Sequence, residues 1–415
     1  MQIDSYDSLE IRSQKEREET DLHALIQQIK QLKQTSTYWA KALVNCEESE
    51  LSSLDDLKDW PMLVKSELID IQEAAKPYGN IVSPDKHAIR RVFFSPGPII
   101  EPQPMSENDS WQMARALYAA GFRQGDMVAN CFSYHLTPAG FMFDEAIAEI
   151  GCTVFPAGVG NVDTLVQAFN YLNINCYVGT PDFLKVIIEK AELLGQPITS
   201  VKKACVSGGP LFPDLKKWYQ DKGIAIYQCY GTAELGLIAY ESDDKNDGMI
   251  INENCYVEIV STGTSNPVKE GEVGEVVVTT FNRKYPLIRF ATGDLSAFIQ
   301  SDASTGRSNR RLKGWLGRAD QTAKVRGMFV HPKQVVRVAD KFPSIKKVRV
   351  EISEDEGHDA MVFICESSEQ SQTLEHKLKD AIRSECRLRG EVVFVDFNSL
   401  PNDGKVIDDK RQIGV

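Results

Sequence analysis

Four short stretches of the sequence combine glycines with charged and aromatic side chains that suit nucleotide chemistry. In chain order they cover residues 230–234, 289–295, 317–327 and 400–405. Each stretch alone is commonly a turn or a solvated face. All four together, in this order and at these intervals, indicate a site that handles a nucleotide.

The first two stretches contain groups for a base, a metal ion and a ribose. Tyr230 precedes Gly231 at the end of a predicted strand, where a planar base could lie close to the backbone. Glu234 could hold Mg²⁺, which prefers carboxylates combined with phosphate oxygens; the alternatives are a solvated residue or a helix-start acid. Asp294 follows a glycine on a turn, and its carboxylate could accept hydrogen bonds from two neighbouring ribose hydroxyls.

The last two stretches supply positive charge. Arg318, Lys324 and Arg326 lie near a predicted domain boundary, where they could meet an anion or form a solvated strand face. Lys405 follows a glycine in a loop, so its ammonium could reach negative charge that develops during a reaction. Both features fit the handling of a phosphorylated ligand.

The elements that must position these residues follow from the pattern of apolar side chains. Apolar residues at helical spacing predict a helix in the first 45 residues, packed on the main body. From about residue 110 to 235 helical and strand-like runs alternate, which predicts a parallel sheet covered by helices. Residues 257–280 predict an antiparallel β region. Residues 320–415 contain three strand-like runs and a helix, which predicts a separate core.

Composition excludes several classes of protein. The chain has 415 residues, 42% of them apolar, and a net charge of −12, so it is a poor binder of nucleic acid. It has no continuous apolar segment of membrane-spanning length and no signal or transit peptide pattern. The nine cysteines form no CxxC pair, which favours a reduced, cytoplasmic protein without zinc or redox motifs of that type.

Three further segments carry family signatures. Residues 60–68 read WPMLVKSEL, residues 151–156 read GCTVFP, and residues 327–335 read GMFVHPKQV. With the four stretches above, they make most of the chain resemble the adenylate-forming (AMP-dependent synthetase/ligase) superfamily. Within that superfamily, the sequence is most similar to the phenylacetate–CoA ligase-like branch.

The resemblance implies an α/β protein with two domains. Residues 1–319 would form a large N-terminal adenylation domain of mixed sheets, helices and an antiparallel subdomain. Residues 320–415 would form a small, mobile C-terminal α+β lid. It also implies a two-step reaction that uses ATP, Mg²⁺ and coenzyme A: a carboxylic acid forms acyl-AMP, and a thiol then displaces AMP. A homodimer is a further possibility.

The resemblance also gives roles to single residues. Lys405 and Glu234 would be catalytic, with Glu234 as the Mg²⁺ ligand, and Asp320 would be the hinge between the domains. Nucleotide binding would involve Ser207, Gly208, Gly209, Pro210, Tyr230, Gly231, Thr232, Asp294 and Arg318. Coenzyme A would be bound by Lys324, Arg326 and Gly327, and the acyl pocket would include Tyr134 and His135. His135 is alternatively a packed or structural histidine.

The phosphate loop departs from the family pattern. The matching stretch, residues 94–102, keeps Ser95 and Gly97 but lacks the threonines, the second glycine and the lysine of that loop. Prolines remove backbone N–H donors that a phosphate cradle needs. Glu101 lies near the end of the stretch, and an acid beside a triphosphate is repulsive unless a metal intervenes.

Three smaller departures accompany it. Ala233 replaces the hydroxyl residue expected beside the α-phosphate, and Thr232 should point elsewhere. Residues 304–316 contain no cysteine or histidine, so we expect no structural zinc, unlike in many relatives. The C-terminal loop is shortened, which leaves Lys410 as an alternative to Lys405.

Three functions fit these observations. The first is an ATP-dependent ligase that joins an aromatic or medium-sized carboxylic acid to coenzyme A. The second is an adenylating enzyme that loads a carrier-protein thiol. The third is a non-ligase homologue whose degenerate phosphate loop reflects a lost or changed activity. The acid itself is not readable from the sequence.

Overall fold

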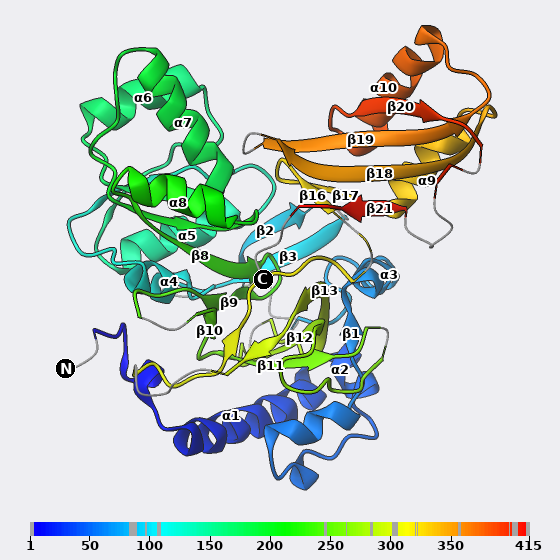
Figure 1. Ribbon diagram of the computed structural model, residues 1–415. Coiled ribbons are helices and arrows are strands. Elements are labelled where there is room, and N and C mark those ends of the chain that lie inside the picture. Colours follow the sequence, from blue (N-terminus) through cyan, green and yellow to red (C-terminus); the bar gives the residue numbers. More distant parts are fainter. Residues whose placement is uncertain are drawn as a thin grey trace. The chain divides into compact units, whose positions relative to one another are not determined.

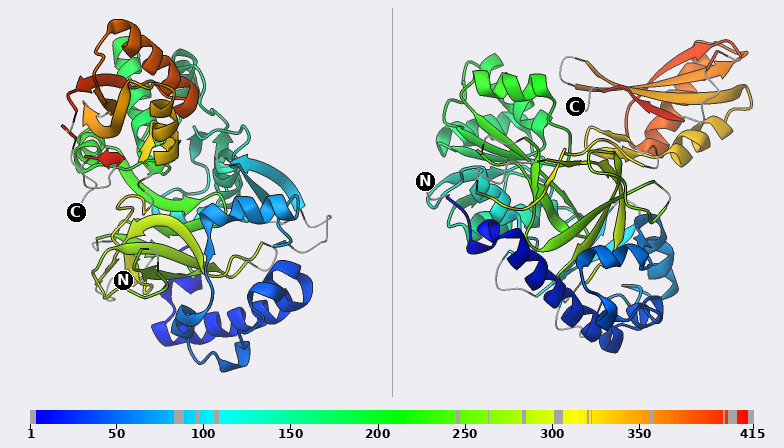
Figure 2. Two further views of the ribbon diagram at one scale, coloured as in Figure 1. Left: turned by 90° about the vertical axis from the view of Figure 1, so that its right-hand side faces the viewer. Right: turned by 60° about the horizontal axis from the view of Figure 1, so that its bottom comes forward.

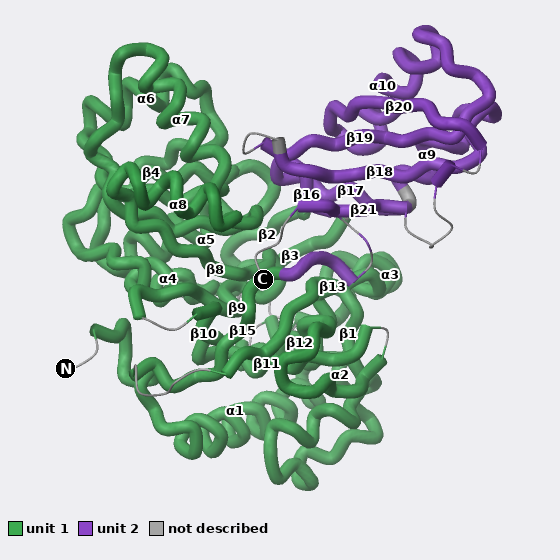
Figure 3. Tube along the Cα trace, viewed as in Figure 1, with its two compact units in different colours: residues 1–315 green, residues 316–415 purple. Residues whose placement is uncertain are grey.

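The computed structural model separates the chain into two compact units, Met1–Trp315 and Leu316–Val415 (Figure 3). The sequence analysis proposed a boundary at 319/320, slightly later in the chain. The structure describes residues 4–82, 89–95, 98–105, 109–244, 247–262, 264–282, 285–300, 306–319, 321, 323–355, 358–397, 399–400 and 406–411, without the side chains of residues 333 and 355.

A nine-stranded mixed sheet forms the α/β part of the first unit (Figure 1). Its parallel strands are β4 (Met127–Asn130), β5 (Thr153–Phe155), β6 (Cys176–Gly179), β7 (Lys203–Val206) and β8 (Ala225–Thr232). Antiparallel strands extend it: β9 (Gly236–Tyr240), β10 (Met249–Ile251), β14 (Phe298–Ile299) and β15 (Arg311–Leu312). Its helices are α4 (Met113–Ala119), α5 (Ala139–Glu149), α6 (Val162–Tyr171), α7 (Pro181–Leu193) and α8 (Pro213–Asp221).

Both faces of the parallel strands are covered, which explains their apolar sequences. Successive residues of β6 point to opposite faces, so Cys176 and Val178 pack with α4 and α5 while Tyr177 packs with α6, α7 and α8. The predicted parallel sheet with helices is therefore confirmed. The strands that extend it as antiparallel neighbours were not predicted as part of this sheet.

A second sheet contains β1 (Leu63–Val64), β13 (Phe290–Ser296), β12 (Gly274–Thr280) and β11 (Cys255–Val260), in that order. The last three are antiparallel, as predicted for this region, and β1 joins β13 in parallel. A separate hairpin consists of β2 (Ile89–Ser95) and β3 (Ile99–Pro104).

The N-terminal segment packs on this second sheet through its apolar side chains (Figure 2). It contains η1 (Ser8–Ile11), α1 (Gln14–Thr35), α2 (Thr37–Ala42), η2 (Glu48–Glu50), η3 (Leu54–Asp59), η4 (Lys65–Glu67) and α3 (Leu68–Ala74). The predicted amphipathic helix is present but is two helices, because Ser36 ends α1 and caps α2 with its hydroxyl.

The second unit contains β16 (Ala323–Val325), β17 (Met328–Val330), α9 (Pro332–Asp340), β18 (Ile345–Asp355), β19 (His358–Ser367), α10 (Gln372–Cys386), β20 (Glu391–Val395) and β21 (Ile407–Asp409). Four of these strands form a sheet of their own in the order β20, β19, β18, β21, and β16 pairs with β17. The three predicted strands and the helix between the last two are confirmed. The β16–β17 hairpin and α9 were not predicted. Among the described helices of the whole chain, none is long and apolar enough to cross a membrane.

Arg289 fastens the N-terminal segment to the second sheet. Its guanidinium is fully buried and forms two hydrogen bonds to Glu258, each of 3.0 Å. It also donates to the backbone carbonyls of Lys58 and Trp60. The backbone carbonyl of Arg289 accepts from the N–H of Leu63, which starts the pairing of β1 with β13.

We expect Arg289→Met to lower the free energy of unfolding of the first unit by about 3–5 kcal/mol, because it leaves the buried Glu258 carboxylate without its partner. Urea unfolding followed by tryptophan fluorescence measures this, since all five tryptophans lie in the first unit. Lys217→Met, which removes an exposed pair with Asp221, should cost under about 1 kcal/mol. Equal losses in the two variants would contradict this account of Arg289.

Candidate functional site

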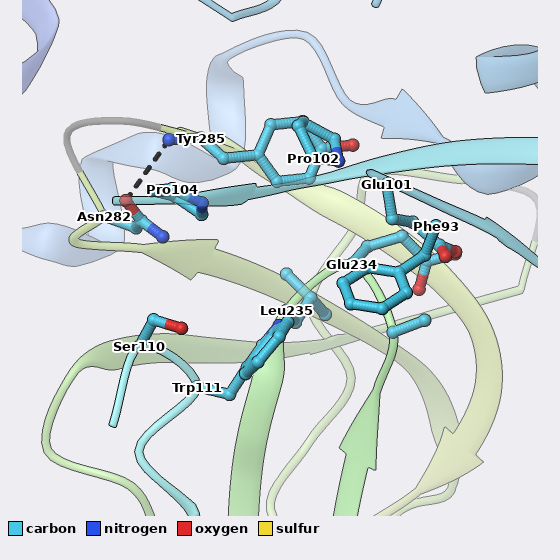
Figure 4. A pocket seen from close by; sticks show the side chains of 11 residues that line it. Phe93, Glu101, Pro102, Pro104, Ser110, Trp111, Glu234, Leu235, Asn282 and Tyr285 are labelled. Atoms are coloured by element: carbon cyan, nitrogen blue, oxygen red, sulfur yellow. Dashed lines mark hydrogen bonds between the residues drawn. The ribbon is translucent and has the colours of Figure 1, made fainter. Parts of the chain in front are cut away.

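A pocket in the first unit lies where four segments of the chain meet. Its lining residues come from the β2–β3 hairpin, from the segment just before α4, from the turn between β8 and β9, and from the segment before β13 (Figure 4). They are Phe93, Glu101, Pro102, Pro104, Ser110, Trp111, Ala233, Glu234, Leu235, Asn282 and Tyr285. Of the predicted site residues, this pocket contains Glu234.

Glu234 is held by a lysine from a different part of the chain. Lys65 Nζ lies 2.8 Å from Glu234 Oε1, and the Glu234 side chain is almost completely buried. Burial opposes ionisation of the carboxyl, but the Lys65 ammonium outweighs it and keeps the pKa of Glu234 below its ordinary value. Glu234 is therefore a buried carboxylate at the end of the turn that follows β8.

A second buried acid, Glu101, lies beside it on β3. In Figure 4 the side chains of Glu101 and Glu234 converge, with their carboxylate oxygens next to each other. Burial, reinforced by the negative charge of Glu234, raises the pKa of Glu101 to about 8. The Ser95 hydroxyl donates to Glu101 Oε2 over 2.5 Å.

The hydrogen bond between Ser95 and Glu101 bears on the role expected for the phosphate loop. Ser95 was predicted to contact phosphate, but here its hydroxyl is hydrogen-bonded to Glu101. The two side chains lie on the same face of the hairpin, since Phe93 pairs with Glu101 and Ser95 with Ile99. Gly97, the other retained residue, lies outside the described residues.

Asp294 forms the second half of the site, on β13. Its Oδ2 accepts a hydrogen bond of 2.8 Å from the Tyr230 hydroxyl, and its Oδ1 accepts one of 3.0 Å from Trp315 Nε1. These bonds fix the orientation of a carboxylate that is only 7% exposed. A carboxylate accepts several hydrogen bonds, which is the chemistry that ribose hydroxyls need. The hydroxyl of Tyr230 points to Asp294, and the ring is 9% exposed.

The predicted turn at residues 207–210 follows the carboxyl end of β7, the edge at which open α/β sheets bind ligands. The Ser207 hydroxyl donates to the carbonyl of Cys229, and Gln228 Nε2 donates to the carbonyl of Gly209. Gly208 has a φ of +76°, a conformation that glycine adopts without strain. The turn, which ends at Pro210, is thus tied to β8 directly before Tyr230.

The turn after β8 depends on its residue types. A Cβ on Gly231 would lie 2.6 Å from the carbonyl oxygen of Gly236, so only glycine fits there. The Thr232 hydroxyl accepts a hydrogen bond from the backbone N–H of Leu235 and is used within the turn. Ala233 itself lines the pocket, where its methyl group offers no hydrogen bond.

The residues predicted for the acyl pocket lie elsewhere in the first unit. Tyr134 donates a hydrogen bond of 2.8 Å to Asp144 and accepts one from Asn130, whereas His135 is exposed. Neither lines the pocket that contains Glu234.

The remaining predicted residues belong to the second unit. Lys324 lies over the ring of Phe329, as Arg318 does, and Arg326 donates to the backbone carbonyl of Asp359. Gly327, with a φ of +80°, completes the β16–β17 turn. Lys410 pairs with Glu351 over 2.6 Å.

Two predicted residues of the second unit cannot be placed. Lys405 and Asp320 lie outside the described residues.

Sequence reasoning missed three residues that shape the site. Lys65 lies in the family signature of residues 60–68, but no function was predicted for it. Tyr285 and Trp315 lie in no motif that the sequence analysis identified. All three act through contacts between distant segments, which a local pattern does not reveal. Across the part of the chain that the structure describes, no three His, Cys, Asp or Glu side chains gather in a way that could hold a metal ion.

Comparisons with known proteins relate the chain to a family. The model of the AMP-binding enzyme family matches residues 146–282. The phenylacetate–coenzyme A ligase of Aromatoleum evansii is 27% identical over 353 residues, which cover 81% of this chain and 78% of the relative. That of Escherichia coli (strain K12) is 26% identical over 380 residues, 86% of this chain and 85% of the relative.

Solved structures agree on the fold. A crystal structure of 2-hydroxyisobutyryl-CoA ligase in complex with 2-HIB-AMP and CoA matches with a TM-score of 0.85. It is 21% identical, and the match covers 98% of this chain and 92% of that chain. With the relatives and the family model, this confirms the resemblance seen in the motifs. The chain belongs to the AMP-binding, adenylate-forming superfamily, within its phenylacetate–CoA ligase-like branch of acid–CoA ligases.

Proposed function

We propose that this adenylate-forming acid–CoA ligase activates an aromatic or medium-sized carboxylic acid. A carboxylate oxygen attacks the α-phosphorus of ATP, and the bond to pyrophosphate breaks. The thiolate of coenzyme A then attacks the acyl carbon, and AMP leaves. The observation that carries the proposal is Asp294, a buried carboxylate whose orientation is fixed by hydrogen bonds from Tyr230 and Trp315.

The first unit provides the groups for the nucleotide. Asp294 would accept the ribose hydroxyls, and Tyr230 would present its ring to the adenine. The turn that contains Gly208 and Gly209 would lie against the base and the acyl group. Glu234 would hold Mg²⁺, which neutralises phosphate charge when it is bound. The acyl group would reach toward Tyr134 and His135.

The second unit would provide the mobile groups. Lys405 would stabilise the charge that develops at the α-phosphate, and Arg318 would contact the ribose or phosphate. Asp320 would be the hinge, and Lys324, Arg326 and Gly327 would meet coenzyme A. The pairing of Lys410 with Glu351 engages the ammonium of the alternative lysine, which favours Lys405.

One observation supports a second candidate, a homologue that no longer adenylates. Ser95, the retained hydroxyl of the phosphate loop, is hydrogen-bonded to Glu101 instead of being directed to an anion. A protein of this kind would still bind AMP at Asp294 but would not release pyrophosphate. A carrier-protein thiol in place of coenzyme A is a variant of the main proposal that uses the same first unit.

The proposal predicts acid-dependent pyrophosphate release from ATP and Mg²⁺, followed by a CoA thioester. A panel of phenylacetate, benzoates, indole acids and short fatty acids, each with and without coenzyme A, tests this. In Lys405→Ala pyrophosphate release should fall by about 100-fold or more, the range found for one lost charge-stabilising group. If no acid of the panel supports pyrophosphate release while AMP still raises the melting temperature, the result favours the second candidate.

We expect Asp294→Asn to weaken AMP binding by about 10- to 100-fold, because hydrogen bonds to a charged group contribute about 1.5–3 kcal/mol each. Isothermal titration calorimetry with AMP measures this loss. Asp214→Asn, at an exposed position at the start of α8, is the matched control and should bind AMP as the wild type does. AMP affinity unchanged in Asp294→Asn would remove the basis for this site.

Ala233→Ser should restore the missing hydroxyl beside the α-phosphate. The gain expected from one such hydrogen bond is about tenfold in AMP affinity or adenylation rate. Calorimetry with AMP and single-turnover pyrophosphate release would detect it. A serine that leaves both quantities unchanged would show that residue 233 does not face the α-phosphate.

A further inference from the structure

Three buried oxygen atoms of residues that line the pocket have no hydrogen-bond partner among the residues that the structure describes. They are Glu101 Oε1, Glu234 Oε2 and the hydroxyl oxygen of Tyr285. The residues are only 2%, 5% and 4% exposed. Buried polar atoms without partners are rare in native proteins, because each costs the free energy of its lost hydration. Three in one small pocket indicate that a ligand completes it.

The two carboxylates are arranged in the same way. Each has one oxygen that a neighbour fixes: Ser95 donates to Glu101 Oε2, and Lys65 binds Glu234 Oε1. In each, the other oxygen has no hydrogen-bond partner within the described part of the chain. This is how ligand carboxylates are usually oriented, with an outer group holding one oxygen while the second is free to bind.

The charges in the pocket call for a cation. Glu101, Glu234 and Tyr285 line the same pocket, and the side chains of the two acids converge there (Figure 4). With both acids ionised, the Lys65 ammonium balances one of the two negative charges, and the lining residues that the structure describes include no cation that would balance the other. Burying such a charge is costly unless it is paired or coordinates a metal. Oxygen donors alone select hard cations such as Mg²⁺ or Mn²⁺.

We propose that Glu101 and Glu234 together bind one divalent cation, with Tyr285 completing the oxygen shell directly or through a bound water. Glu101 is therefore not a defect of the phosphate loop but a second carboxylate ligand. Its role in catalysis rests on the function proposed above. There, a cation held by two carboxylates would supply the positive charge that the loop lost with its lysine. Binding of the cation by the free protein does not depend on that function.

Titration of the full-length protein with Mn²⁺, in the absence of nucleotide, tests this directly. Electron paramagnetic resonance reports the free ion, so one bound Mn²⁺ per chain should be lost from the signal, and Mg²⁺ should compete for it. Glu101→Gln and Tyr285→Phe should each weaken Mn²⁺ binding by at least about tenfold, the loss typical even for groups one shell removed from a metal. Glu189→Gln, an exposed acid on α7, is the control and should bind normally.

Two results would overturn the proposal. One is the absence of Mn²⁺ binding by the wild type at millimolar concentration, which would mean that water or a shared proton fills the pocket. The other is wild-type affinity in both Glu101→Gln and Tyr285→Phe, because Glu234 would then act without them. Melting temperatures of the variants show whether they fold. If Mn²⁺ binds as expected but no acid supports pyrophosphate release, the cation site stands and the ligase function fails.

Discussion

The candidate site depends on one buried interaction, the pairing of Arg289 with Glu258. A guanidinium removed from water must have its charge and its donors satisfied, and Arg289 achieves this by binding Glu258 and two carbonyls of the N-terminal segment. The segment is thereby held beside β13. Lys65, just after β1, can then reach Glu234, while Asp294 follows Arg289 along β13. The pairing of Arg289 with Glu258 thus helps to position both Glu234 and Asp294.

The altered phosphate loop belongs to the same electrostatic arrangement. A loop that binds phosphate with backbone N–H groups and a lysine presents positive potential to an anion. Here the hairpin instead presents Glu101, whose neighbours are Ser95 and a second carboxylate. Two buried carboxylates in one pocket favour a cation or a proton over an anion. Asp294, the residue proposed to bind the ribose, accepts hydrogen bonds from Tyr230 and Trp315.

Sequence patterns predicted the part of the fold in which strands and helices alternate. Strands and helices that alternate between residues 110 and 235 each bury enough apolar surface to show their periodicity, so the parallel sheet was predictable. The short strands β14 and β15 carry no such signal. Their pairing with β10 is decided by contacts between segments far apart in the chain. The hairpin of β16 and β17 was missed because its strands have only three residues each, too few to show a period.

The sequence by itself determined the chemistry that is available: Tyr230, Glu234 and Asp294 stand in motifs whose order identifies the superfamily, and Glu101 marks a changed loop. Only the tertiary structure decided how these groups are used. It places Lys65 on Glu234, Trp315 on Asp294 and Tyr285 beside two carboxylates. Charges and hydrogen bonds act through space over a few ångströms, and the folded chain alone determines which side chains come that close.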